Sequence, residues 1–130
     1  EPECLQVCVD NNTAVVHHQM AESVAYLYSM AKTVVITSAD NGGSQRSVLE
    51  ALSCNVPVVV MEDSTMTTEY IRECGVGEIV NPDPSSIRAA VERLKDKPVN
   101  TRDWILENYS EFTYATKVKQ GIESICSSQS

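Results

Sequence analysis

The stretch from Val34 to Val60 constrains the fold of this chain more than any other part of the sequence. It opens with an apolar, β-branched run at Val34–Ile36 and closes with a second run, predicted as a strand from Val56 to Met61 that is entered through Pro57. Both runs are typical of strands that are covered on two faces. Between them lie a small polar loop and residues with the apolar spacing of a helix. This order predicts a strand–turn–helix–strand unit of a parallel α/β sheet.

The loop between the first strand and the helix has the features of an anion-binding turn. Its two consecutive glycines let the backbone turn tightly and let a ligand approach closely. Ser44 is the predicted N-cap of a helix that begins near Gln45, so the first amides of that helix point into the loop at the positive end of the helix dipole. The candidate binding residues of the loop are Asp40, Asn41, Gly42, Gly43 and Ser44.

Glu50 is the second candidate residue of this stretch. It lies about 200° around the helical wheel from Val48, and therefore well off the apolar face that Val48, Leu49 and Leu52 share. A position roughly 9 Å along the helix axis from Ser44 leaves the carboxylate beside the loop. There it can accept hydrogen bonds from two sugar hydroxyls while the start of the helix holds phosphate. The pair of features predicts a nucleoside diphosphate as ligand.

The remaining segments continue the alternation of strands and helices. Asp83 and Pro84 form a strong helix start, and Gly75 is a predicted left-handed helix stop. Further strands are predicted at Thr13–His17 and Glu78–Val80, and further helices at Ala21–Ala31, Met66–Cys74, 84–94, Thr101–Asn108 and Ser110–Cys126. The predicted fold class is α/β, a Rossmann-like three-layer parallel sheet with helices on both faces and a helical C-terminus.

The predicted domain organisation is a single partial domain over residues 1–130. It comprises an initial segment 1–12, an α/β core 13–94, a hinge 95–100 that contains Pro98, and C-terminal helices 101–126. In the core, loops 38–44 and 62–65 both follow strands, and ligands of parallel sheets bind where strands end. Ser64 and Thr65 therefore either contact a ligand or cap the next helix. Tyr26 and Tyr28 are predicted to be packing residues.

The charge balance and the cysteines narrow the function classes. Ten basic and eighteen acidic residues give a formal net charge of −8, which disfavours nucleic acid and anionic membranes as partners. No apolar run approaches the roughly 20 residues that span a bilayer. Five cysteines without a CxxC pair indicate reduced thiols and a cytoplasmic protein. The adjacent His17 and His18 would point to opposite faces of a strand, so no metal site is predicted.

An ordered set of short motifs resembles the C-terminal, donor-binding domain of GT-B-fold retaining glycosyltransferases, the glycosyltransferase group 1 family. The resemblance implies that the chain is part of an enzyme that transfers a sugar from a nucleoside diphosphate sugar to an unknown acceptor, with no cofactor besides this substrate. It also implies that Glu50 binds the ribose of the donor and that loop 62–65 approaches the donor. The matching residues are Leu27-Tyr28, Ala31, Ser38, Leu49-Glu50-Ala51-Leu52, Pro57-Val58-Val59, Glu69-Tyr70-Ile71 and 77–83.

One position departs from the family pattern. The family often carries two glutamates separated by seven residues; the second corresponds to Glu50, whereas the first, which lies near the transferred sugar, corresponds to Gly42. Asp40 and Asn41 are the candidates to substitute for it. Two alternatives therefore stay open. One is a non-catalytic α/β module that has lost donor binding. The other is a domain similar to UDP-N-acetylglucosamine 2-epimerases, because residues 40–45 resemble the phosphate-binding turn of those enzymes. A receiver-type signalling domain ranks lower, because its acidic cluster and lysine are missing.

The resemblance further implies partners that the chain itself does not supply. Family members carry an acceptor-binding N-terminal domain and a preceding strand–helix–strand unit whose arginine and lysine neutralise the diphosphate. We expect the fragment alone to bind nucleotide weakly and to be inactive, and an unpaired sheet edge to favour self-association. Arg46, the cation nearest to the loop, either reaches phosphate or points to solvent. The apolar stripe Ala115, Val118, Ile122 and Ile125 fits either a crossing toward the acceptor domain or docking on the sheet.

Overall fold

The computed structural model describes residues 21–37, 46–62 and 65–129, with the backbone alone at 21–23, 65 and 66. In these residues three parallel strands form one sheet in the order β1 (Val34–Ile36), β2 (Val58–Met61) and β3 (Glu78–Val80). Val34 lies opposite Val58, and Val59 lies opposite Glu78. The parallel pairing confirms the predicted sheet type. The strand expected at Thr13–His17 lies outside the described residues.

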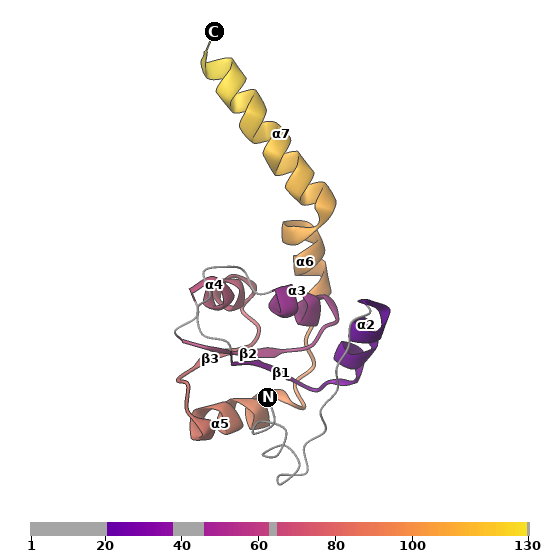
Figure 1. Cartoon of the computed structure of the whole chain (residues 1–130), viewed down its shortest axis with the longest axis vertical. Coiled ribbons are helices and arrows are strands. Elements are labelled where there is room, and N and C mark those ends of the chain that lie inside the picture. Colours follow the sequence, from indigo (N-terminus) through magenta and orange to yellow (C-terminus); the bar gives the residue numbers. More distant parts are fainter. Residues whose placement is uncertain (1–20, 38–45, 63–64, 130) are drawn as a thin grey trace, which may run out of the picture.

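Helices cover both faces of this sheet, so the predicted three-layer α/β architecture is confirmed. Helices α3 and α4 lie on one face and α5 lies on the other, while α2 stands beside α3 (Figure 1). Two further helices follow one another away from the sheet. The helix bounds are α2 Ala21–Met30, α3 Arg46–Ser53, α4 Thr65–Cys74, α5 Pro84–Leu94, α6 Arg102–Tyr109 and α7 Glu111–Ser128.

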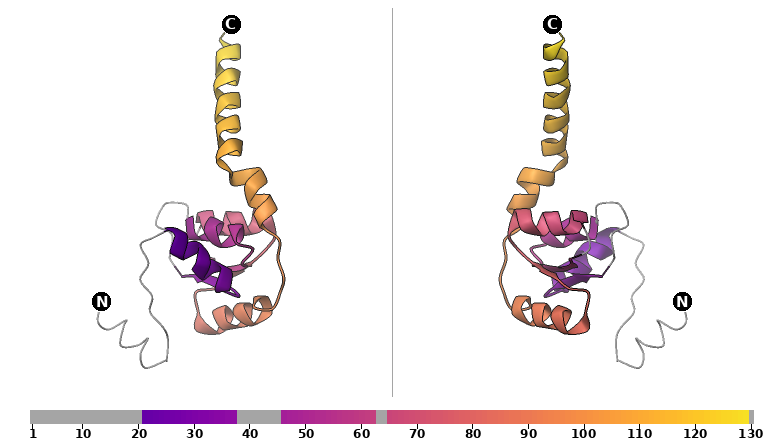
Figure 2. Two further views of the ribbon diagram at one scale, coloured as in Figure 1. Left: turned by 90° about the vertical axis from the view of Figure 1, so that its right-hand side faces the viewer. Right: turned by 90° about the vertical axis from the view of Figure 1, so that its left-hand side faces the viewer.

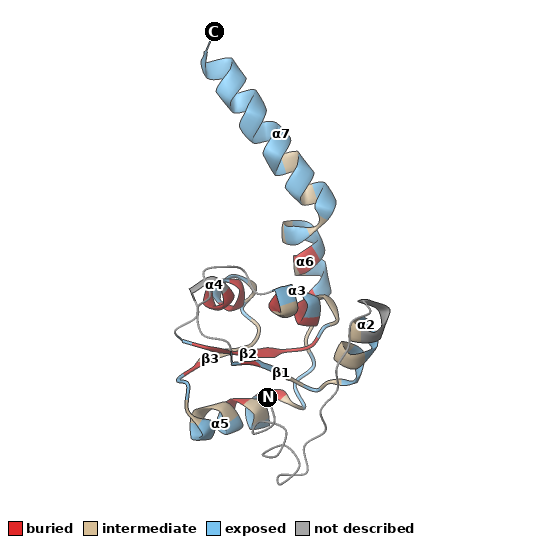
Figure 3. Ribbon diagram, viewed as in Figure 1, coloured by how far each residue is buried: buried red, intermediate tan, exposed pale blue. Residues whose placement is uncertain are grey.

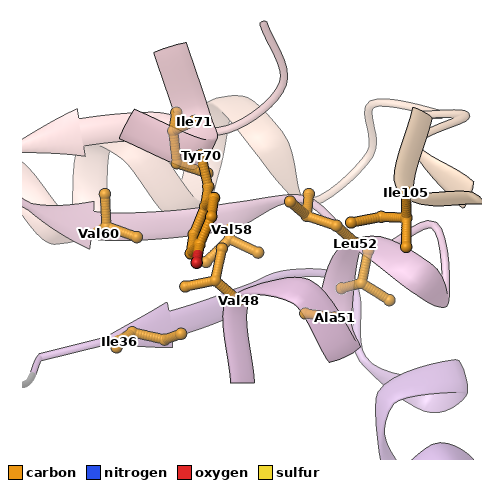
Figure 4. Close-up of a cluster of buried hydrophobic side chains, with 10 residues drawn as sticks. Ile36, Val48, Ala51, Leu52, Val58, Val60, Tyr70, Ile71 and Ile105 are labelled. Atoms are coloured by element: carbon orange, nitrogen blue, oxygen red, sulfur yellow. The ribbon is translucent and has the colours of Figure 1, made fainter. Parts of the chain in front are cut away.

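The central strand β2 joins two hydrophobic clusters. Its residues point alternately to the two faces, so Val58 and Val60 pack in the α3–α4 cluster, whereas Val59 packs with Ala90 and Leu94 of α5. Every residue of β2 is buried, which explains why its sequence is continuously apolar rather than alternating. Figure 4 shows the larger cluster, in which side chains of β1, β2, α3, α4 and α6 meet.

Short sequence signals determine where α5 begins and where α4 ends. The Asp83 side chain accepts a hydrogen bond from the Ser86 backbone N–H at 2.9 Å and caps α5, with Pro84 as its first residue. Gly75 ends α4 with a φ of +67°, as predicted for a left-handed stop. The face of α5 that packs on the sheet consists of Ala90 and Leu94, which are buried, and of Ile87 and Val91, which are partly buried.

Helix α7 extends away from the sheet and lies almost entirely in solvent (Figures 2 and 3). Its apolar stripe is exposed: Val118 is 43%, Ile122 57% and Ile125 62% accessible. Docking of this stripe on the sheet, one of the two expected arrangements, is therefore wrong. Tyr26 is also 64% accessible, so the prediction that it packs is wrong, because it lies on the outer face of α2. None of the described helices is both long and apolar enough to cross a membrane.

Candidate functional site

The candidate site lies where the strands end. Because β1 and β2 are parallel, the chain leaves both at the same edge of the sheet and enters α3 and α4 from there. The convergence that was predicted for the two loops holds for their flanking residues, Thr37 and Glu62. The candidate loop residues Asp40, Asn41, Gly42, Gly43 and Ser44, together with Ser64, lie outside the described residues, and so does the side chain of Thr65.

Glu50 is placed as the helical wheel predicts. Val48, Ala51 and Leu52 of α3 are fully buried against the sheet, whereas Glu50 is exposed on another face of the helix. The burial of Ala51 broadens the apolar face, and Leu49 packs at its margin. A carboxylate in solvent, one turn beyond the start of α3, keeps its lone pairs available for a ligand.

Tyr28 is the polar partner of Glu50. The phenol oxygen of Tyr28 donates a hydrogen bond to Glu50 Oε2 at 3.1 Å. Partial burial and this hydrogen bond raise the pKa of Tyr28 to about 12, so the hydroxyl stays protonated and remains a donor at neutral pH. The prediction that Tyr28 is a packing residue is confirmed for its ring, which contacts the core. The apolar spacing of α2 gave no sign of the hydroxyl's role, because the partner is 22 residues away.

A concave pocket between α2 and α3 surrounds this pair. Its volume is about 370 Å³, within the range of about 300–1,000 Å³ that is common for small-molecule sites. The wall is mainly apolar, with the Glu50 carboxylate as its charged group. The lining residues are Val24, Ala25, Tyr28, Glu50, Ser53 and Cys54.

A second hollow runs along the outer edge of β3, between α4 and α5. Its volume is about 570 Å³ and it holds two arginines, Arg72 and Arg93. Arg93 makes a two-nitrogen contact with Glu78, with Nε to Oε1 at 2.9 Å. Arg72 donates to the Thr68 hydroxyl at 3.3 Å. Both guanidiniums therefore already have partners, and the hollow is a weaker candidate than the pocket at Glu50.

The remaining candidate residues from the sequence lie on exposed helix surfaces or are free cysteines. Arg46 is the first residue of α3 and is exposed, so its contact with phosphate stays a prediction. Glu69 is exposed on α4. Cys54, Cys74 and Cys126 are free thiols. In the described part of the chain, no three His, Cys, Asp or Glu side chains gather into a group that could hold a metal ion.

The chain matches the family described as Glycosyl transferases group 1 over residues 3–112. No curated protein and no solved structure matches it. The matched region holds the sheet, the candidate loop, Tyr28 and Glu50, so the residues of the candidate site lie within the shared sequence pattern. Because the match covers far more than half of its length, the chain belongs to the glycosyl transferases group 1 family, whose members transfer sugars.

Proposed function

We propose that this domain binds the nucleotide part of a nucleoside diphosphate sugar, as the donor-binding portion of a retaining glycosyltransferase. The observation that carries the proposal is the exposed Glu50 carboxylate, which lies about one turn along α3 from Arg46 and lines the pocket between α2 and α3. Family membership supports sugar transfer. The carboxylate supplies acceptors for the two vicinal hydroxyls of a ribose.

The diphosphate is assigned to the start of α3. Main-chain N–H groups and the positive end of the helix dipole hold anions without a basic surface, which reconciles an anionic ligand with a net charge of −8. In the intact enzyme these amides stabilise the negative charge that develops on the departing nucleoside diphosphate. Asp40, Asn41, Gly42, Gly43, Ser44 and Arg46 are the proposed residues of this part, together with Ser64 and Thr65 after β2.

We further propose that the domain works with an acceptor-binding domain and does not transfer sugar alone. Support comes from α7, which is exposed along much of its length (Figure 3) and carries Val118, Ile122 and Ile125 among its exposed apolar residues. Exposed apolar patches of this kind mark surfaces that contact another domain or protein. Sugar transfer by the purified 130-residue chain would refute this part of the proposal.

The test of donor binding is a titration of the ¹⁵N-labelled chain with uridine, adenosine and guanosine 5′-diphosphates. At least one nucleotide is expected to shift amide signals clustered at residues 40–50. Glu50→Gln should weaken that binding about 10- to 100-fold, the effect of losing charged hydrogen-bond acceptors. Glu69→Gln, which changes an exposed carboxylate on α4, is the matched control and should bind like the parent chain. Absence of shifts with all three nucleotides would favour the non-catalytic module.

A further inference from the structure

The Tyr28–Glu50 pair connects two helices that the sequence separates by 22 residues. The Tyr28 ring packs against the hydrophobic core that lies between the sheet and α3 and α4. Packing on a rigid core fixes the ring, and the ring carries its hydroxyl to a fixed point at the rim of the pocket. The hydroxyl meets Glu50 Oε2 there at 3.1 Å.

This contact restrains a side chain that is otherwise free to move. Glu50 is exposed on α3, and a solvated glutamate populates several rotamers that a ligand must reduce to one. The tyrosine hydroxyl occupies one acceptor position of Oε2 and leaves Oε1 and the other Oε2 position open. Oε1 keeps two open acceptor positions and Oε2 keeps one, so the carboxylate can accept from two neighbouring hydroxyl donors, as in the 2′,3′-diol of a ribose.

We infer that Tyr28 is a positioning residue for donor recognition, which holds the Glu50 carboxylate in the orientation that accepts the ribose diol. This inference rests on the proposed function of Glu50 as the ribose ligand. Tyr28 acts through Glu50 and contributes by lowering the entropy that the carboxylate loses on binding. Its effect is therefore specific to ligands that carry the diol.

The experiment compares Tyr28→Phe with the parent chain, using the nucleoside 5′-diphosphate that binds best in the titration above and its 2′,3′-dideoxy form. The phenylalanine keeps the packed ring and removes only the hydroxyl. Tyr28→Phe should weaken binding of the ribonucleotide about 3- to 10-fold, the range expected for the net contribution of one ordinary hydrogen bond, because the lost contact acts on the ligand only through Glu50. Its affinity for the dideoxy form should stay within about twofold of the parent chain.

Two further variants make the result decisive. Tyr26→Phe removes the hydroxyl of an exposed tyrosine on the same helix and should leave both affinities unchanged. Adding Tyr28→Phe to Glu50→Gln should cost nothing beyond Glu50→Gln alone, because the two residues act as a unit. Equal losses for both nucleotides, or no loss for the ribonucleotide, would overturn the role of Tyr28 while leaving donor binding intact. A parent chain that binds no nucleotide would instead overturn the proposed function, and the inference with it.

Discussion

The side-chain oxygen of Asn55 accepts hydrogen bonds from the backbone N–H groups of Thr101 and Arg102, each at 2.9 Å. Asn55 lies in the turn after α3, and the two amides open α6. In return the Thr101 hydroxyl donates to the Leu52 carbonyl in the last turn of α3 at 2.6 Å. The end of one helix and the start of another thus satisfy backbone groups that neither could satisfy internally.

Replacement of Asn55 by alanine should destabilise the fold by about 2–5 kcal/mol. Asn55 has a φ of +59°, a conformation that costs alanine roughly 1–2 kcal/mol, and loss of the acceptor leaves a buried amide unpaired at a cost of about 1–3 kcal/mol. Urea unfolding measures the difference. Asn55→Gly avoids the cost of the positive φ, because glycine adopts this conformation readily, and should lose about half as much unfolding free energy as Asn55→Ala. Asn55→Asp keeps both features, so a loss as large as that of alanine would contradict the account.

Local features of this chain could be predicted from its sequence, whereas contacts between distant residues could not. Gly75 and the Asp83–Pro84 pair act within a few residues of themselves, and the continuous apolar run of β2 needs only burial on two faces, so all three were predicted. The contact of Asn55 with Thr101 could not be foreseen, since it depends on how separate elements are placed. The hydroxyl of Tyr28 escaped notice for the same reason, and Tyr26 was misassigned because tyrosine suits both packed and exposed positions.

Gly77 should tolerate no side chain, whereas Gly75 should tolerate one at moderate cost. A Cβ on Gly77 would lie 2.5 Å from the backbone oxygen of Val58, and its φ is +112°. Gly77→Ala is therefore expected to lose about 2–4 kcal/mol of unfolding free energy. Gly75 has a φ of +67° but nothing within 4 Å of an added Cβ, so Gly75→Ala should lose only about 1–2 kcal/mol. Equal losses in thermal unfolding would show that the close approach to β2 is wrong.

Asp83 should make the stability of the fold depend on pH in the acid range. Hydrogen bonds from the Ser85 and Ser86 side chains, followed by the Ser86 amide, lower the pKa of Asp83 from 3.8 to about 2. A carboxylate with a lowered folded-state pKa stabilises the fold above the unfolded value, and the stabilisation is lost as the pH falls from 3.8 through about 2.

The measurement compares the parent chain with Asp83→Asn, which keeps a capping oxygen and removes the charge. Melting temperatures between pH 6 and pH 2 should differ by a constant amount at the upper end and converge between about pH 4 and pH 2. Asp103→Asn, in the first turn of α6, serves as a surface-charge control. A gap for Asp83→Asn that stays constant down to pH 2 would contradict the lowered pKa.

The exposed stripe of α7 should contribute nothing to the stability of the α/β core. Ile122 is 57% accessible, whereas Leu52 of α3 is fully buried. Ile122→Ser is therefore expected to change the free energy of unfolding by no more than about 0.5 kcal/mol, while Leu52→Ala should lose about 2–5 kcal/mol. Native-state hydrogen exchange adds a spatial readout, because amides of β2 should keep their protection in the α7 variant and lose it in the core variant. A loss above about 1.5 kcal/mol for Ile122→Ser would mean that α7 packs on the sheet in solution, and the surface proposed for an acceptor-binding domain would then already be occupied.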